Sequence, residues 1–141
     1  MNKLQSKGFS LIELMVVVAV VAVLAAIAYP SYTSYILKSQ RTVAITTLLK
    51  IQAAYESYYA QNSSYPTSTT NPTADSFLPV ATNYYSYANT NAHATTYTLQ
   101  ATALGNQVND TAKDGTSCGA QPASLTIDQT GNQLPSSCWT Q

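Results

Sequence analysis

The segment from Phe9 to Tyr29 constrains this chain most, because it is apolar throughout apart from Ser10 and Glu13. A helix that rises about 1.5 Å per residue covers about 30 Å over such a run, which is the thickness of the hydrocarbon core of a bilayer. The segment therefore predicts a helix that can span a membrane. It is longer and more evenly apolar than a secretory signal peptide, and no small-residue cleavage site follows it.

The charges beside this segment predict its orientation. Lys3 and Lys7 precede it, whereas the next basic residue is Lys38. Because positive charges stay on the cytoplasmic side, we expect the N-terminus inside and the bulk of the chain outside. An acidic side chain at the centre of a membrane helix costs roughly 2.5–3.5 kcal/mol, so the presence of Glu13 in this segment requires an explanation. Two explanations are open: the carboxylate has a function, or the segment is a plain membrane anchor whose glutamate reaches the interface.

The stretch KGFSLIELMVVVAVVAVLAAIAYPSY resembles the leader junction and N-terminal helix of type IV pilins. The resemblance implies that residues 1–8 are a basic leader, which a prepilin peptidase cuts after Gly8. Phe9 would then be the mature N-terminus and would be N-methylated, and Pro30 would be the family's helix-kinking proline. Glu13 would pair with the methylated amine of a neighbouring subunit, which offers a reason for a carboxylate in this segment.

Beyond the proline, apolar residues recur at steps of three, four or seven and predict an amphipathic helix that runs to about Gln61. These residues are Leu37, Ala44, Leu48, Ile51, Tyr55 and Tyr58. The sequence NSSYP at Asn62–Pro66 ends the helix. The polar segment Thr67–Leu78 has no period and is expected to be a loop, at the place of the variable loop of pilins.

Strand patterns fill the rest of the chain. Residues 84–89 and 95–104 are each expected to form a strand, and residues 123–134 a strand, a turn and a second strand. One face of the second segment carries Tyr97, Leu99, Ala101 and Ala103, and Gly131 and Asn132 lie in the expected turn. The predicted class is α+β: a type IV pilin fold, in which a long kinked N-terminal helix packs its C-terminal half on a small antiparallel sheet.

The resemblance divides the chain into a leader at 1–8, a transmembrane or filament-core helix at 9–36 and a globular head at 37–141. Eleven tyrosines are concentrated in AYESYY and NYYSYAN. They predict either an aromatic core or a surface that stacks on a partner, and the scarcity of basic residues favours the core.

Charge argues against nucleic acid as a partner of this chain alone. Cleavage after residue 8 removes two of the six basic residues and leaves four against six acidic ones, so the net charge becomes −2. Phosphate binding needs clustered cations, and we see no basic patch.

Cys118 and Cys138 form an even cysteine count in a chain expected outside the cytoplasm, which predicts a disulfide. It would close a loop worth roughly 3 kcal/mol in the chain-entropy model, and it resembles the disulfide that bounds the C-terminal region of pilins. No metal or cofactor is expected, because the single histidine, His93, is far from both cysteines.

We do not expect an enzyme, since no phosphate loop, catalytic triad or carboxylate pair is evident. The acids Asp110, Asp114 and Asp128 are interpreted as turn formers, and His93 as a solvated loop residue.

The Tyr-rich helix end, TTYTLQATAL and the terminal CGAQPASLTIDQTGNQLPSSCW resemble minor pilins of the pilus-assembly class. The resemblance implies a subunit that waits in the inner membrane and is then built by the assembly platform into a surface pilus with other pilins. It would support pilus biogenesis, twitching motility, adhesion or DNA uptake. Two alternatives stay open: a type II secretion pseudopilin, whose head often carries a calcium loop, and a DNA-binding competence pilin, which needs an electropositive strip.

Overall fold

The computed structural model describes residues 9–67, 77–119 and 124–140. The expected leader and residues 68–76 of the expected loop lie outside the described residues. The chain divides into two compact units, residues 1–35 and 36–141, and each is described by itself.

A single helix, α1 (Leu11–Asn62), begins in the first unit and ends in the second. Its bounds confirm the expected helix to within one residue at each end. By length and composition it can cross a membrane, and from Phe9 to Tyr35 no side chain is buried.

The helix continues through Pro30, whose missing N–H removes one backbone hydrogen bond. Nearby hydroxyls bond to helix carbonyls: Thr33 Oγ1 donates to the Pro30 carbonyl at 2.9 Å, and Ser34 Oγ to the Ser31 carbonyl at 3.1 Å. The kink expected at Pro30 stays a prediction.

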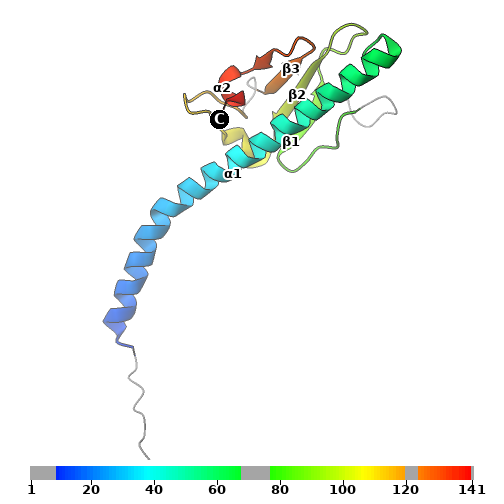
Figure 1. Cartoon of the computed structure of the whole chain (residues 1–141). Coiled ribbons are helices and arrows are strands. Elements are labelled where there is room, and N and C mark those ends of the chain that lie inside the picture. Colours follow the sequence, from blue (N-terminus) through cyan, green and yellow to red (C-terminus); the bar gives the residue numbers. More distant parts are fainter. Residues whose placement is uncertain (1–8, 68–76, 120–123, 141) are drawn as a thin grey trace, which may run out of the picture. The chain divides into compact units, whose positions relative to one another are not determined.

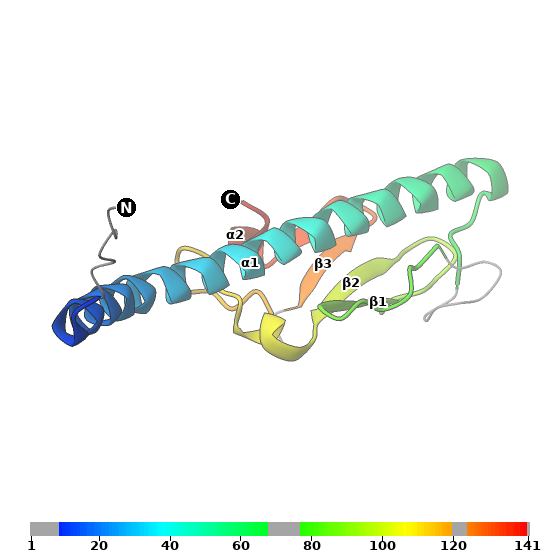
Figure 2. The same ribbon diagram turned by 90° about the horizontal axis from the view of Figure 1, so that it is seen from below.

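The second unit is an antiparallel sheet beside the C-terminal part of α1 (Figures 1 and 2). The strands are β1 (Tyr85–Asn89), β2 (Thr98–Ala103), β3 (Leu125–Asp128) and β4 (Gln133–Leu134), and they lie in this order. Tyr87 pairs with Ala101, and Leu99 with Ile127. The predicted strands and their antiparallel arrangement are confirmed.

One hydrophobic core joins α1 to the sheet, because alternate strand residues face the helix. The buried residues of α1 are the predicted Ala44, Leu48, Ile51 and Tyr55, together with Arg41. Tyrosines 55, 65, 85, 87 and 97 are all buried in this core. The interpretation of the tyrosines as an aromatic core is confirmed for these five.

The turn between β3 and β4 is organised by Asp128. Its Oδ1 accepts hydrogen bonds from Thr130 N, Thr130 Oγ1 and Asn132 N at 2.9, 2.6 and 3.0 Å. Burial works against ionisation, but these bonds hold the pKa of Asp128 below its usual value. Gly131 supplies the left-handed residue of the turn, with φ of 78°.

Two short helices were not predicted: η1 (Gly105–Asn109) and α2 (Ser136–Trp139).

Candidate functional site

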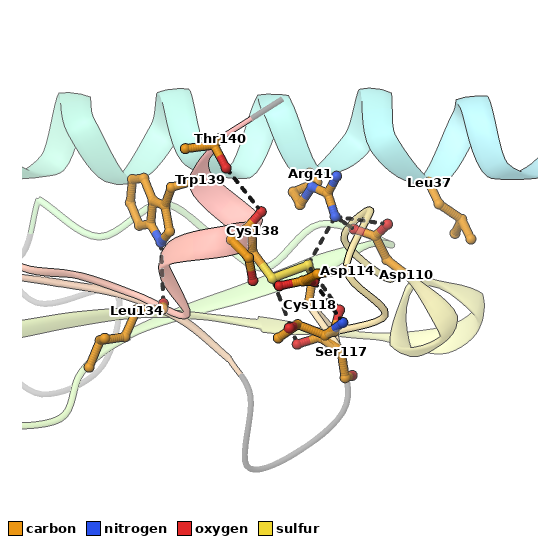
Figure 3. The surroundings of a disulfide bond; sticks show 12 residues. Leu37, Arg41, Asp110, Asp114, Ser117, Cys118, Leu134, Cys138, Trp139 and Thr140 are labelled. Atoms are coloured by element: carbon orange, nitrogen blue, oxygen red, sulfur yellow. Dashed lines mark hydrogen bonds and ion pairs between the residues drawn. A yellow bond between two sulfur atoms is a disulfide. The ribbon is translucent and has the colours of Figure 1, made fainter.

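The expected disulfide between Cys118 and Cys138 is present, and both residues are fully buried (Figure 3). It ties the loop that follows η1 to α2. Arg41 of α1 lies against it, with Nη1 at 3.0 Å from Cys118 Sγ. The same Nη1 forms a buried ion pair with Asp110 Oδ2 at 3.2 Å. The disulfide therefore holds the C-terminal region of the head together, and Arg41 fixes that region to the long helix through its ion pair with Asp110 and its contact with Cys118.

Gln107 completes this buried polar cluster. Its Nε2 donates to the Leu37 carbonyl at 2.9 Å, to the Tyr85 hydroxyl at 3.0 Å and to Asp110 Oδ2 at 3.3 Å. Burial raises the pKa of Asp110, although Arg41 and Gln107 favour its ionised form. The cluster connects α1, β1 and η1, so it fixes the position of three elements.

The turn interpretation of Asp110 is incomplete, because its carboxylate lies inside the head as the partner of Arg41. One signal in the sequence could have found it. Arg41 is four residues after Leu37 and three before Ala44, so it belongs to the buried face of the helix. A cation on such a face requires a buried carboxylate. His93, by contrast, is exposed as expected.

Gly119 lies directly against this cluster. A Cβ at this position would collide with the backbone of Gln107 and Val108. The amide of the preceding residue, Cys118, donates to the Asp110 carbonyl at 2.9 Å. The close approach of the two backbones explains why a glycine follows the cysteine.

A second polar contact stabilises the C-terminal end of α1. Glu56 Oε1 accepts hydrogen bonds from the Tyr97 hydroxyl at 2.7 Å and from the Tyr65 hydroxyl at 3.1 Å. Tyr65 also stacks on Tyr59, with ring centroids 4.4 Å apart. Burial and the neighbouring carboxylate raise the pKa of Tyr65 to about 12. These contacts tie the chain leaving the helix to β2.

A groove of about 520 Å³ opens between α1 and the segment that leads into β1. Gln40, Val43 and Thr47 line it from the helix. Pro79, Thr82, Asn83 and the tyrosines 84, 85 and 87 line it from the other side. It has the size of a ligand site, and none of its lining residues carries a charge.

The residues expected to direct processing and assembly lie in the first unit. Gly8 lies outside the described residues. Phe9 is 82% exposed, and Glu13 lies in the first turn of α1, where its amide donates to the Ser10 carbonyl at 3.1 Å. Within residues 9–67, 77–119 and 124–140, no three His, Cys, Asp or Glu residues are grouped so that they could hold a metal ion.

Two family models match the chain. The model described as "Prokaryotic N-terminal methylation motif" matches residues 3–29. The model described as "Type IV minor pilin ComP, DNA uptake sequence receptor" matches residues 30–121, which is more than half of the chain. No curated protein matches the chain.

Two solved pilin structures are similar to the chain, and the first of them shows the same fold. A type IV pilin from Shewanella oneidensis is 23% identical, with a TM-score of 0.52, and the match covers 74% of this chain and 99% of that one. The non-core minor pilin PilV of Neisseria meningitidis is 21% identical, with a TM-score of 0.48, and the match covers 71% and 86%. From the methylation motif, the pilin fold and above all the extent of the longer family match, the chain belongs to the ComP family of type IV minor pilins.

Proposed function

We propose that this minor pilin is made as a membrane precursor, cut after Gly8, methylated at Phe9 and then incorporated into a type IV pilus. Residues 9–36 would cross the inner membrane first and later lie in the filament core, and residues 37–141 would form the exposed head. The match of the methylation-motif model to residues 3–29 supports the cleavage and the modification.

The observation that carries the proposal is the contrast between the two units. The head buries its own core, whereas the apolar side chains from Phe9 to Tyr35 are exposed, among them Leu11, Ile12 and Leu24. An apolar surface of this extent needs lipid or protein to cover it. In the precursor lipid covers it, and in the pilus the helices of other pilin subunits do.

Glu13 favours the move of the helix from the membrane into the filament. In lipid the carboxylate has no partner, whereas in the filament it pairs with the methylated N-terminal amine of a neighbouring subunit. Removing one member of a buried ion pair costs roughly 3–5 kcal/mol, so the pair favours one register of subunit against subunit.

The test replaces Glu13 by Val and by Gln, with Glu13→Asp as the charge-preserving control. Membrane fractions and sheared surface filaments are then compared by immunoblot. We expect all variants to reach the membrane, and Glu13→Val and Glu13→Gln to be missing from filaments. Normal incorporation of Glu13→Val would remove the carboxylate from the mechanism.

The partners implied are a prepilin peptidase, the pilus assembly platform and other pilins, with the N-terminus of the precursor in the cytoplasm. Through the pilus the subunit would contribute to biogenesis, twitching motility or adhesion. The pseudopilin alternative is disfavoured, because the longer family match is to pilus subunits and the head ends in a disulfide.

DNA binding is the second candidate function, and the family match is what favours it. The charge of the head limits how it could work. Of the four basic residues after the leader, Arg41 is buried in an ion pair, which leaves Lys38, Lys50 and Lys113 exposed. Three separate lysines are too few for tight, sequence-independent binding of a duplex. A DNA-binding head would therefore depend on contacts to bases.

The test measures binding of labelled DNA, single-stranded and duplex, by the full chain in non-ionic detergent micelles. Binding of either form that falls on addition of salt supports this candidate. No binding of either form would eliminate it and leave the structural function intact.

A further inference from the structure

The groove between α1 and β1 offers hydrogen-bonding groups that the fold does not use. Thr47 Oγ1 donates to the Val43 carbonyl, and Thr82 Oγ1 bonds to the backbone of Tyr85. In contrast, the side-chain amides of Gln40 and Asn83 have no hydrogen-bond partner among the residues that the structure describes. An amide presents a donor beside an acceptor, which is the pattern that the edge of a nucleobase also presents.

An aromatic ring lies beside these amides. The side chain of Tyr84 is 42% exposed at the groove. Its backbone is held on both sides, because Tyr84 N donates to Thr82 Oγ1 at 3.2 Å and the Tyr84 carbonyl accepts from Leu104 N at 2.8 Å. A partly exposed ring on a fixed backbone is a stacking surface for a flat ligand.

An exposed lysine follows the groove-lining residues along the helix. Gln40, Val43 and Thr47 line the groove, and Lys50 follows Thr47 by three residues. Positions three and four apart share a face of a helix, so Lys50 belongs to the groove face, one turn beyond it. Lys50 is exposed, so its ammonium group is free to meet an anionic group of a ligand that extends from the groove along the helix.

We infer that this groove binds one unstacked base of single-stranded DNA, stacked on Tyr84, hydrogen-bonded by Gln40 and Asn83, and with its phosphate near Lys50. This inference rests on the DNA-binding candidate function and names its site. The lining of the groove is uncharged, so it can accommodate a neutral base but offers no cation to neutralise the phosphates of a DNA backbone. A base in a duplex is covered by its neighbours in the stack, so only a base that has left the stack can enter a recess.

The arrangement predicts an unusual salt dependence. The logarithm of the binding constant falls with the logarithm of salt concentration by about 0.7 for each phosphate neutralised on a single strand. One lysine at the groove therefore predicts a slope near 0.7, whereas a basic strip that contacts several phosphates gives a slope several times larger.

The experiment measures fluorescence anisotropy of a labelled single strand of about twelve nucleotides, and of its duplex, with the full chain in non-ionic detergent micelles. Tyr84→Ala should weaken single-strand binding about fivefold or more, whereas Tyr84→Phe should keep most of it. Gln40→Ala and Asn83→Ala should each weaken it, with Asn106→Ala on η1 as the matched amide control.

The lysines supply a second matched pair. Lys50→Gln should weaken binding and flatten the salt dependence. Lys113→Gln should change neither, because this exposed lysine lies after η1 and not on the helix that lines the groove. Circular dichroism and an intact disulfide show for each variant that the head is folded.

The outcomes separate the site from the function. DNA binding that is unchanged by Tyr84→Ala, or that favours the duplex over the single strand, overturns the groove as the site and leaves the candidate function standing. No binding of either DNA form overturns both. Selective binding of a neutral saccharide that depends on Tyr84, with no binding of the single strand, would also overturn the inference.

Discussion

Replacing Arg41 by Met tests the polar cluster that holds the head to its helix. The side chains of Arg41 and Asp110 are only 4% and 2% exposed, so the substitution leaves a buried carboxylate without its cation. Breaking a buried pair in this way typically costs about 3–5 kcal/mol. For a domain of this size that loss corresponds to a fall in melting temperature of at least about 10 °C.

The pH dependence of this loss can be worked out from the structure. Burial already raises the pKa of Asp110 with Arg41 present, and removal of the guanidinium raises it further. A carboxyl with a raised native pKa stabilises the fold fully below its unfolded value, near 3.9, and loses that contribution as the pH rises through its native pKa. The penalty of Arg41→Met is therefore largest at neutral pH and shrinks toward pH 4.

The assay is urea unfolding of the full chain in detergent, followed by the emission of the single tryptophan, Trp139, which adjoins Cys138. The double variant Arg41→Met, Asp110→Asn should recover most of the loss, because no uncompensated charge remains. A loss below about 1 kcal/mol, a loss independent of pH, or a double variant as unstable as the sum of the single ones would refute the reasoning.

Three further predictions concern the same unit. Replacing both Cys118 and Cys138 by Ser should lower the free energy of unfolding by about 3 kcal/mol, measured by the same urea titration, and an unchanged midpoint would contradict the structural role of the disulfide. Gly119→Ala should cost roughly 1–3 kcal/mol, because its Cβ meets the backbone of Gln107; a stability equal to that of the wild type would show that the two backbones separate freely. Because the pKa of Tyr65 rises to about 12, the contribution of this side chain to stability is full below pH 10 and is lost as the pH rises through 12. Ultraviolet titration of the native chain should therefore show a phenol that resists ionisation at pH 11. Complete ionisation of the tyrosines at that pH would refute the buried contact between Tyr65 and Glu56.

The sequence predicts the elements of this fold well wherever a face is repeatedly buried. The spacing of Leu48, Ile51 and Tyr55 and the alternation of Leu99 and Ala101 each match the buried residues of the structure. Both patterns are long enough for their period to be recognised, and in both the buried residues are apolar.

The contacts between distant residues were harder to predict. Arg41 and Asp110 are separated by 69 positions, and nothing local to Asp110 distinguishes a buried carboxylate from a turn former. The helices η1 and α2 are too short to show a period. The groove is formed where α1 meets the segment before β1, so its members become neighbours only in the folded head.

Mass spectrometry of sheared surface filaments tests the central claim most directly, because it asks in one measurement whether the chain is cut and whether it leaves the membrane for a fibre. The account predicts a filament subunit that begins at N-methylated Phe9 and in which Cys118 and Cys138 are oxidised. A chain that retains Met1 and is found only in the membrane fraction would contradict it.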